Sequence, residues 1–213
     1  ARTHDYGEQP VDHLAKLLRS ESIEAAQLVL PKAFSEINSY DEVTPRLVEQ
    51  IRRNFEEENV KIQILGCYMD LANPDDDVRK NAVDTFKKCL KFNQILGAAI
   101  VGTETAYPRL SRAEKKIWHP YMMDSIACLA EEAERLDVDM AIEPVYWQPL
   151  EDLETTVKVF EKVDSSHLKM IFDPANVLEF PEIDQDAYWK EWLCVLGDKI
   201  EAIHMKDFVE GPN

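Results

Sequence analysis

The stretch Val138-Asp139-Met140-Ala141-Ile142-Glu143 is a short, largely apolar run that ends in a carboxylate. The same pattern recurs at Leu168 to Asp173, which ends in a second carboxylate, and at Ile200 to His204, which ends in an imidazole. A charged side chain at the end of a buried strand is costly unless another group compensates it. Three such ends, separated by helical patterns, predict one shared site at which Glu143, Asp173 and His204 converge.

Other apolar runs show little polar alternation, which is typical of parallel strands buried on both faces. They lie at Ile23 to Leu30, Val60 to Met69 and Ala98 to Thr103, with a shorter candidate at Ala1 to Tyr6. Between the runs, apolar residues repeat every three or four positions, as on one face of a helix. We expect helices at Val11 to Arg19, Val43 to Glu57, Asp76 to Leu96 (capped by Gly97), Ile126 to Leu136, Leu153 to Phe160 and Trp189 to Leu196.

Strand candidates start roughly every 30 to 40 residues, the length of one strand–helix unit. Repeated right-handed units close on themselves, so we predict an α/β fold of the (β/α)8 TIM-barrel class, with residues 1–213 in a single domain. The complete fold needs eight strands and ~250 residues. We therefore expect the eighth strand and the extreme N-terminus to lie outside this sequence, which leaves the barrel incomplete at its C-terminal end. An open doubly wound sheet is the alternative, weakened because no glycine-rich phosphate loop follows an early strand.

The composition narrows the partners. The formal net charge is −17, and no basic stripe is present to neutralise phosphates, so we expect no nucleic-acid partner. The sequence has no bilayer-length apolar run and no basic-then-apolar leader, which predicts a soluble, cytoplasmic protein with no membrane partner. Its 4 cysteines are widely spaced, so we expect free thiols on apolar faces in a reducing compartment. The 4 tryptophans fit a core or an interface, which leaves a homo-oligomer open.

Strand parity supports the shared site, because alternate residues of a strand face the same way and barrel active sites lie at the C-terminal strand ends. The residues expected in the inward register are Ala141, Glu143, Ile171, Asp173, His204 and Lys206, and those expected to face the helices are Ile142, Phe172, Ile203 and Met205. Two carboxylates and one imidazole suit a divalent cation such as Mn²⁺, Mg²⁺, Co²⁺ or Zn²⁺. Each alone has an ordinary structural explanation, and only their convergence favours a metal site.

Further strand-end residues are weaker candidates for substrate binding. Asn176, three residues past Asp173, is placed to hydrogen-bond a substrate hydroxyl or, equally, to satisfy its own backbone. Lys206 is suited to stabilise negative charge on an oxygen or to neutralise an acidic pocket, whereas the neighbouring Asp207 faces outward by parity. Glu104 closes the run that starts at Ala98, and His4 closes the N-terminal candidate, so both are expected at the same end of the barrel.

These motifs resemble those of the xylose-isomerase-like TIM barrel superfamily, in particular its sugar phosphate isomerase/epimerase family. The resemblance covers essentially the whole sequence and rests on Ile142-Glu143-Pro144, Asp173-x-x-Asn176 and His204-x-Lys206-Asp207, with weaker support from Arg2 to Asp5, Leu65 to Tyr68 and Val101 to Thr105. It implies that Glu143, Asp173 and His204 bind one divalent metal ion, with a fourth ligand on an eighth strand outside this sequence. Many epimerases of the family have His where this sequence has Asn176, which leaves the substrate open.

The resemblance also implies a reaction, namely metal-dependent isomerisation or epimerisation of a sugar or sugar phosphate through an enediolate. A metal that holds a ketose carbonyl and its neighbouring hydroxyl acidifies the adjacent C–H. Glu143 is then the expected catalytic base on one face, with the Glu of the eighth strand on the other. Epimerisation needs bases on both faces whereas aldose–ketose isomerisation can use one, so the sequence leaves the two open.

Two alternatives stay open. A barrel that binds a sugar or a metal without turnover is favoured by the lack of a fourth ligand within the sequence. An endonuclease-IV-like DNA repair enzyme belongs to the same superfamily, but it needs a zinc cluster with many histidines and a basic groove. The 5 histidines and the net charge of −17 disfavour it.

Overall fold

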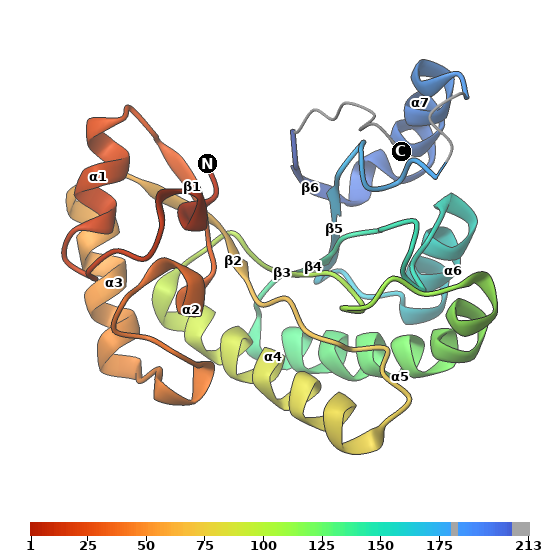
Figure 1. Ribbon diagram of the computed structural model, residues 1–213, viewed down its shortest axis with the longest axis horizontal. Helices are drawn as coiled ribbons and strands as arrows, with labels where there is room; N and C mark the ends of the chain where they lie inside the picture. The colour runs from red at the N-terminus through yellow and green to blue at the C-terminus, as the bar shows by residue number, and fades with distance from the viewer. Residues whose placement is uncertain (180–182, 206–213) are drawn as a thin grey trace.

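The computed structural model describes residues 1–179 and 183–205, and its central feature is a sheet of six parallel strands. In order across the sheet, the strands are β1 (Ala25–Leu28), β2 (Lys61–Gly66), β3 (Ile100–Thr103), β4 (Met140–Ile142), β5 (Leu168–Phe172) and β6 (Ile200–Ile203). The sheet curves into an open arc with helices on its outer side (Figure 1). The described residues thus form an α/β half-barrel, which confirms the predicted fold class.

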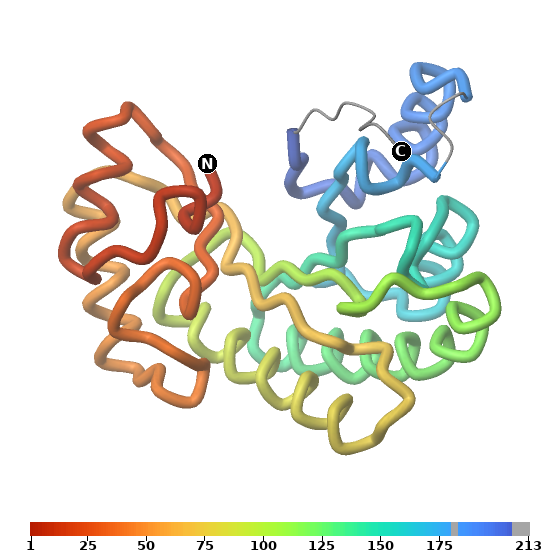
Figure 2. Tube along the Cα trace, in the orientation of Figure 1, coloured from red at the N-terminus to blue at the C-terminus, as the bar shows by residue number. Residues whose placement is uncertain are grey.

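Helices connect the strands throughout the described part of the chain. They are α1 (Leu14–Ser20), α2 (Leu30–Ala33), α3 (Pro45–Glu57), α4 (Asp76–Leu96), α5 (Arg112–Leu136), α6 (Leu153–Val163) and α7 (Gln185–Leu196), with 3-10 turns η1 (Thr3–Tyr6), η2 (Tyr40–Glu42) and η3 (Gly197–Lys199). The two longest helices, α4 and α5, pack against each other along the outside of the arc (Figure 2).

Local signals set the ends of the long helices. The Asp75 side chain caps α4 by accepting hydrogen bonds from the backbone N–H groups of Asp77 and Val78. Gly97 ends the helix in the left-handed conformation with φ 73°, which costs glycine little. The predicted helix from Asp76 to Leu96 is therefore confirmed at both ends. Ser111 starts α5 with a capping box that Glu114 completes.

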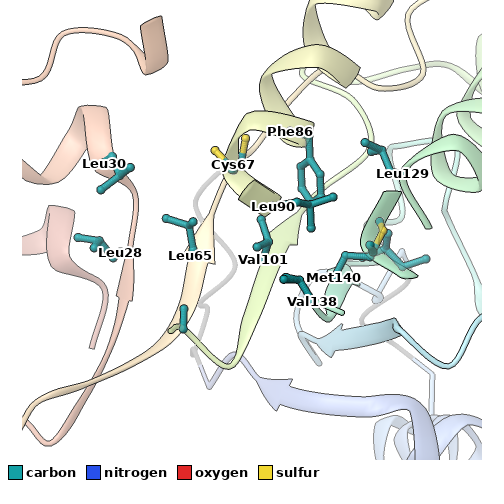
Figure 3. Packing of buried hydrophobic residues seen from close by; sticks show 14 of the residues in the cluster. Leu28, Leu30, Leu65, Cys67, Phe86, Leu90, Val101, Leu129, Val138 and Met140 are labelled. Carbon is teal, nitrogen blue, oxygen red and sulfur yellow. The ribbon is translucent and has the colours of Figure 1, made fainter. Parts of the chain in front are cut away.

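One apolar layer lies on each side of the sheet. The outer layer packs strand residues such as Leu65, Val101 and Met140 against Phe86 of α4 and Leu129 of α5 (Figure 3). The inner layer is a small cluster on the concave side, made by Ile64, Ile100, Ala141 and Ile171, with Ala202 packed against it. Because alternate strand residues belong to different layers, the side chains two positions further along the strands also face inward.

Two glycines lie on the inner side of the sheet, where neighbouring side chains leave no space for a β-carbon. A β-carbon on Gly102 would lie 2.6 Å from Ile171 Cδ1 and 2.9 Å from Ile64 Cγ2. A β-carbon on Gly66 would lie 2.8 Å from side-chain atoms of both Tyr68 and Val29. Distances this short are not found between real carbon atoms at rest, so only glycine fits the present packing at these two inward positions.

The N-terminal segment differs from the expected strand. Arg2 forms a single parallel bridge with Gln27, and the following residues turn into η1 before Gly7 leaves it with φ 69°. The predicted strand at Ala1 to Tyr6 is therefore wrong, although the bridge still places the segment alongside β1. The turn is closed by backbone hydrogen bonds from the Asp5 N–H to the Arg2 carbonyl at 3.2 Å and from the Gly7 N–H to the His4 carbonyl at 3.3 Å.

Two other expectations about exposure are corrected. Ile203 is 50% exposed and Met205 is 85% exposed, so these two outward residues do not pack against a described helix as expected. Cys67 and Cys89 are buried, but Cys194 is exposed on α7 rather than on an apolar face. Among the described residues, none of the helices has the length and apolar character needed to cross a bilayer.

Candidate metal centre

The three predicted ligands occupy equivalent positions at the ends of neighbouring strands. Glu143 directly follows β4, Asp173 directly follows β5, and His204 directly follows β6. Of the residues two positions before them, Ala141 and Ile171 belong to the inner apolar cluster and Ala202 packs against it. Strand parity therefore aims all three side chains to the concave side, at the C-terminal ends of the strands.

The ligand atoms lie close together. His204 Nδ1 is 3.1 Å from Glu143 Oε2 and 4.0 Å from Asp173 Oδ2. One ligand atom from each of the three residues can be chosen so that all lie within 4.8 Å of one another. Glu143 is 2% exposed and Asp173 is fully buried, while the His204 side chain is 19% exposed. The site is thus two buried carboxylates with an imidazole on the solvent side.

Hydrogen bonds fix the orientation of these side chains. Asp173 Oδ1 accepts from the backbone N–H groups of Ala175 at 3.0 Å and Asn176 at 3.1 Å, an arrangement that turns the chain back over the strand end. The Asn176 side-chain amide donates to Glu143 Oε1 at 2.8 Å. The His204 backbone N–H donates to the Phe172 carbonyl at 2.9 Å. The centre is therefore held by the backbone as well as by packing.

The donor set fits a divalent cation. Ligand atoms about 2.0 to 2.2 Å from one ion lie no more than about 4.4 Å apart, so only a small side-chain adjustment would bring all three onto a common ion. Two like charges buried side by side repel each other in a medium of low dielectric constant. A divalent cation between the two carboxylates would offset that repulsion, and imidazole with carboxylates is a ligand set for Zn²⁺ or Mn²⁺.

A neighbouring carboxylate, Glu104, lies at the end of β3 and is held by a residue that the sequence analysis did not find. Gln148 is 1% exposed, and its amide nitrogen donates to Glu104 Oε2 at 2.6 Å. Its amide oxygen accepts from the backbone N–H groups of Thr105 at 2.8 Å and Ala106 at 3.0 Å. Because Gln148 is separated from Glu104 by 44 residues, no local pattern in the sequence indicates the contact.

Tyr68 lies on the same concave side, two residues beyond Gly66. Burial raises its pKa well above the ordinary value, and the negative charges of Glu143 and Glu104 add to the shift. The hydroxyl therefore remains protonated at neutral pH.

The remaining predicted residues are placed differently. Asn176 joins the centre twice, because its side-chain amide donates to Glu143 and its backbone N–H donates to Asp173. His4 lies in η1 rather than at the end of a strand, and burial and the charge of Arg2 lower its pKa. Lys206 and Asp207 lie outside the described residues, so their predicted roles stay predictions.

Comparison with known proteins identifies the family. The family model described as xylose isomerase-like TIM barrel matches residues 13–213. This protein belongs to the xylose isomerase-like TIM barrel family, as the sequence motifs predicted. No curated protein matches the chain.

Solved structures share the fold at low sequence identity. The 3-keto-D-glucoside 4-epimerase YcjR from E. coli matches with a TM-score of 0.77 and 12% identity over 97% of this chain and 78% of its own. The IolI protein with a bound zinc atom matches with a TM-score of 0.76 and 14% identity over 99% of this chain and 72% of its own. The D-psicose 3-epimerase with D-tagatose from Clostridium cellulolyticum H10 matches with a TM-score of 0.71 and 16% identity over 91% of this chain, which spans 66% of the epimerase.

Proposed function

We propose that this protein is a divalent-metal-dependent sugar isomerase or epimerase whose reaction proceeds by proton transfer. The observation that carries the proposal is the convergence of Glu143, Asp173 and His204 at the ends of three adjacent strands, with ligand atoms within 4.8 Å of one another. Barrels of this kind hold their active sites at that end of the sheet. The three residues would together hold one divalent cation.

The chemistry would divide between the cation and the side chains. When bound, a divalent cation would polarise a substrate carbonyl and acidify the neighbouring C–H. Glu143 would act as the catalytic base that takes this proton, because its carboxylate lies on the concave side and its orientation is fixed by Asn176. Asp173 and His204 would hold the geometry, with Asp173 locked by two backbone N–H groups.

The proposed substrate class is a sugar. Two of the similar structures are named as epimerases of sugars, and one of these was solved with D-tagatose. At 12 to 16% identity such likeness shows the fold alone, so the substrate class for this protein rests on the site chemistry. A ketose carbonyl with a neighbouring hydroxyl offers two oxygens to one cation, which suits a centre with three protein ligands.

Hydrogen exchange tests the proposal directly. The protein loaded with Mn²⁺ is incubated in deuterated water with D-fructose, D-tagatose and D-psicose, and NMR follows deuterium entry at the carbons next to the carbonyl. We expect exchange on at least one sugar, and Glu143→Gln should slow it by about 10²- to 10⁴-fold. The matched control is Glu134→Gln, which removes an exposed carboxylate from α5 and should exchange like the wild type.

Two results would contradict the proposal. An exchange rate unchanged by Glu143→Gln would reject Glu143 as the base. A wild-type protein that binds Mn²⁺ and a sugar but exchanges no hydrogen would favour the alternative of a binding barrel without turnover.

A further inference from the structure

A second polar site lies on the concave side of the arc, made by Gln27 of β1 and by Tyr68, two residues beyond β2. Gln27 alternates with Ala26 and Leu28, which belong to the outer apolar layer, so its side chain faces inward. A β-carbon on the inward Gly66 would lie 2.8 Å from Tyr68 Cε2 and 3.5 Å from Gln27 Nε2. Both side chains therefore occupy the space above this glycine, on the side of the sheet that carries the metal centre.

One buried polar atom of this pair has no hydrogen-bond partner among the described residues. The Gln27 amide nitrogen donates to the Tyr68 hydroxyl oxygen, although 41 residues separate them. Gln27 is 6% exposed, and among the described residues its amide oxygen has no hydrogen-bond partner. A buried polar atom left in this way has lost the hydrogen bond that it would make with water. Such an exception in a native structure calls for a ligand or another explanation.

The Gln27–Tyr68 pair offers a donor and an acceptor in both orientations of the Gln27 amide. In the present orientation the pair offers one free acceptor, the Gln27 oxygen, and one free donor, the Tyr68 O–H. If the amide is reversed, Tyr68 donates to it, and the pair offers the amide N–H groups as donors and the tyrosine oxygen as acceptor. One donor and one acceptor, side by side, remain in both cases.

The electrostatic surroundings favour a neutral ligand. Burial and the charges of Glu143 and Glu104 raise the pKa of Tyr68, so the hydroxyl keeps its proton. The charge of Glu104, which is not one of the three candidate ligands, would also repel a phosphate dianion placed beside Tyr68. Tyr68 is partly exposed, which gives a ligand access, and the terminal torsion of a glutamine is soft enough for its amide to turn toward it.

We infer that the Gln27–Tyr68 pair binds a free hydroxyl of the substrate, and that the substrate end held there is an unphosphorylated polyol. A hydroxyl donates one hydrogen bond and accepts another, so it complements the pair in either amide orientation. A phosphate offers only acceptors at neutral pH and complements one orientation alone. The inference rests on the proposed function, since the metal centre would hold the reacting end of the same sugar.

The test measures sugar binding in two variants and a matched control. Calorimetry follows the binding of D-fructose, its monodeoxy analogues and D-fructose 6-phosphate to the Mn²⁺-loaded protein. Tyr68→Phe removes only the hydroxyl, and Gln27→Met removes the amide at similar length. Tyr107→Phe is the control, because the Tyr107 hydroxyl donates to the Tyr68 backbone carbonyl and not to the inner site.

We expect Tyr68→Phe and Gln27→Met to weaken D-fructose binding by about 5- to 100-fold, and Tyr107→Phe to weaken it by less than about 2-fold. One monodeoxy analogue should bind the wild type as weakly as D-fructose binds Tyr68→Phe, and Tyr68→Phe should lose nothing more with it. Gln27→Met removes the unpartnered amide oxygen together with the amide bond to Tyr68, so its melting temperature should differ little from that of the wild type. A purely structural glutamine would instead lower the melting temperature.

Three outcomes would overturn the inference. Unchanged D-fructose binding in both variants would show that the pair does not touch the sugar, while hydrogen exchange by the wild type would leave the proposed function standing. Binding of D-fructose 6-phosphate that depends on Tyr68 as strongly as D-fructose binding would reject the unphosphorylated end. A wild-type protein that binds none of the sugars would overturn both proposals, and that failure is recognised because it precedes any substitution.

Discussion

The Asn176 side-chain amide donates a 2.8 Å hydrogen bond to Glu143 Oε1, which joins the loop after β5 to the proposed base at the end of β4. Both residues are buried, so the bond fixes a carboxylate where water cannot readily replace the donor. The backbone N–H of Asn176 also donates a hydrogen bond to Asp173 Oδ1. The residue predicted to hold a substrate hydroxyl thus positions two of the three candidate ligands.

Asn176→Ala should lower the free energy of unfolding by about 1.5 to 3 kcal/mol, because it removes a hydrogen bond to a buried charged group. Urea denaturation followed by circular dichroism measures the change. The control is Asn38→Ala, which removes a similar amide–carboxylate bond to Glu42 at the surface and should lower the free energy of unfolding much less. Equal losses in the two variants would mean that the buried bond is no stronger than the exposed one.

Gly102→Ala should destabilise the fold by about 1 to 3 kcal/mol, because the added methyl group meets Ile171 and the β-branched Ile64 on the narrow inner side. Gly197→Ala is the matched control, since a β-carbon there has no atom within 4 Å and its φ of −59° suits alanine. Thermal unfolding of both variants checks the prediction. A Gly102→Ala protein as stable as the control would show that the inner layer gives way more easily than its packing indicates.

His119 should make stability depend on pH. Burial, followed by the charges of Lys162 and Lys158, lowers its pKa, so the folded state binds its proton less readily than the unfolded state does. The stabilising contribution of neutral His119 is therefore fully present above the unfolded-state pKa of about 6.5. It is lost as the pH falls through the lower pKa of the folded state. His119→Gln should lessen the fall in urea midpoint between about pH 8 and about pH 5, whereas the exposed His13→Gln should retain it. Parallel curves for wild type and His119→Gln would contradict this.

Mn²⁺ should stabilise the folded protein, because an ion that binds only the native state adds about 2.7 kcal/mol at a concentration one hundred times its Kd. Asp173→Asn should abolish the rise in melting temperature by weakening the ligand set. Asp164→Asn is the control: Asp164 is exposed with φ 43°, a conformation that asparagine tolerates well. A rise that persists in Asp173→Asn would place the ion elsewhere.

The sequence was sufficient to predict that Glu143, Asp173 and His204 converge, because strand parity acts over short distances. Glu143 and Ala141, or Asp173 and Ile171, share an inward register that two residues of spacing reveal, and their apolar runs mark buried strands. The two ends of the long helix α4 could also be predicted, since Asp75 and Gly97 are local capping residues. These features depend only on neighbours in the chain.

Other features depend on contacts that no local pattern contains. The Gln148–Glu104 and Gln27–Tyr68 bonds span 44 and 41 residues, so they become visible only when the strands lie side by side. The run at Ala1 to Tyr6 has strand-like residues, but a single bridge to Gln27 is all that forms. The secondary structure of this segment depends on pairing with a distant strand, which local propensity does not indicate.

Anomalous diffraction from crystals grown with Mn²⁺ tests the central claim most directly. We predict one strong peak on the concave side of the sheet, about 2.0 to 2.3 Å from a carboxylate oxygen of Glu143, one of Asp173 and a ring nitrogen of His204. A peak at another position, or none at these residues in a crystal that contains Mn²⁺, would contradict the assignment of the metal centre.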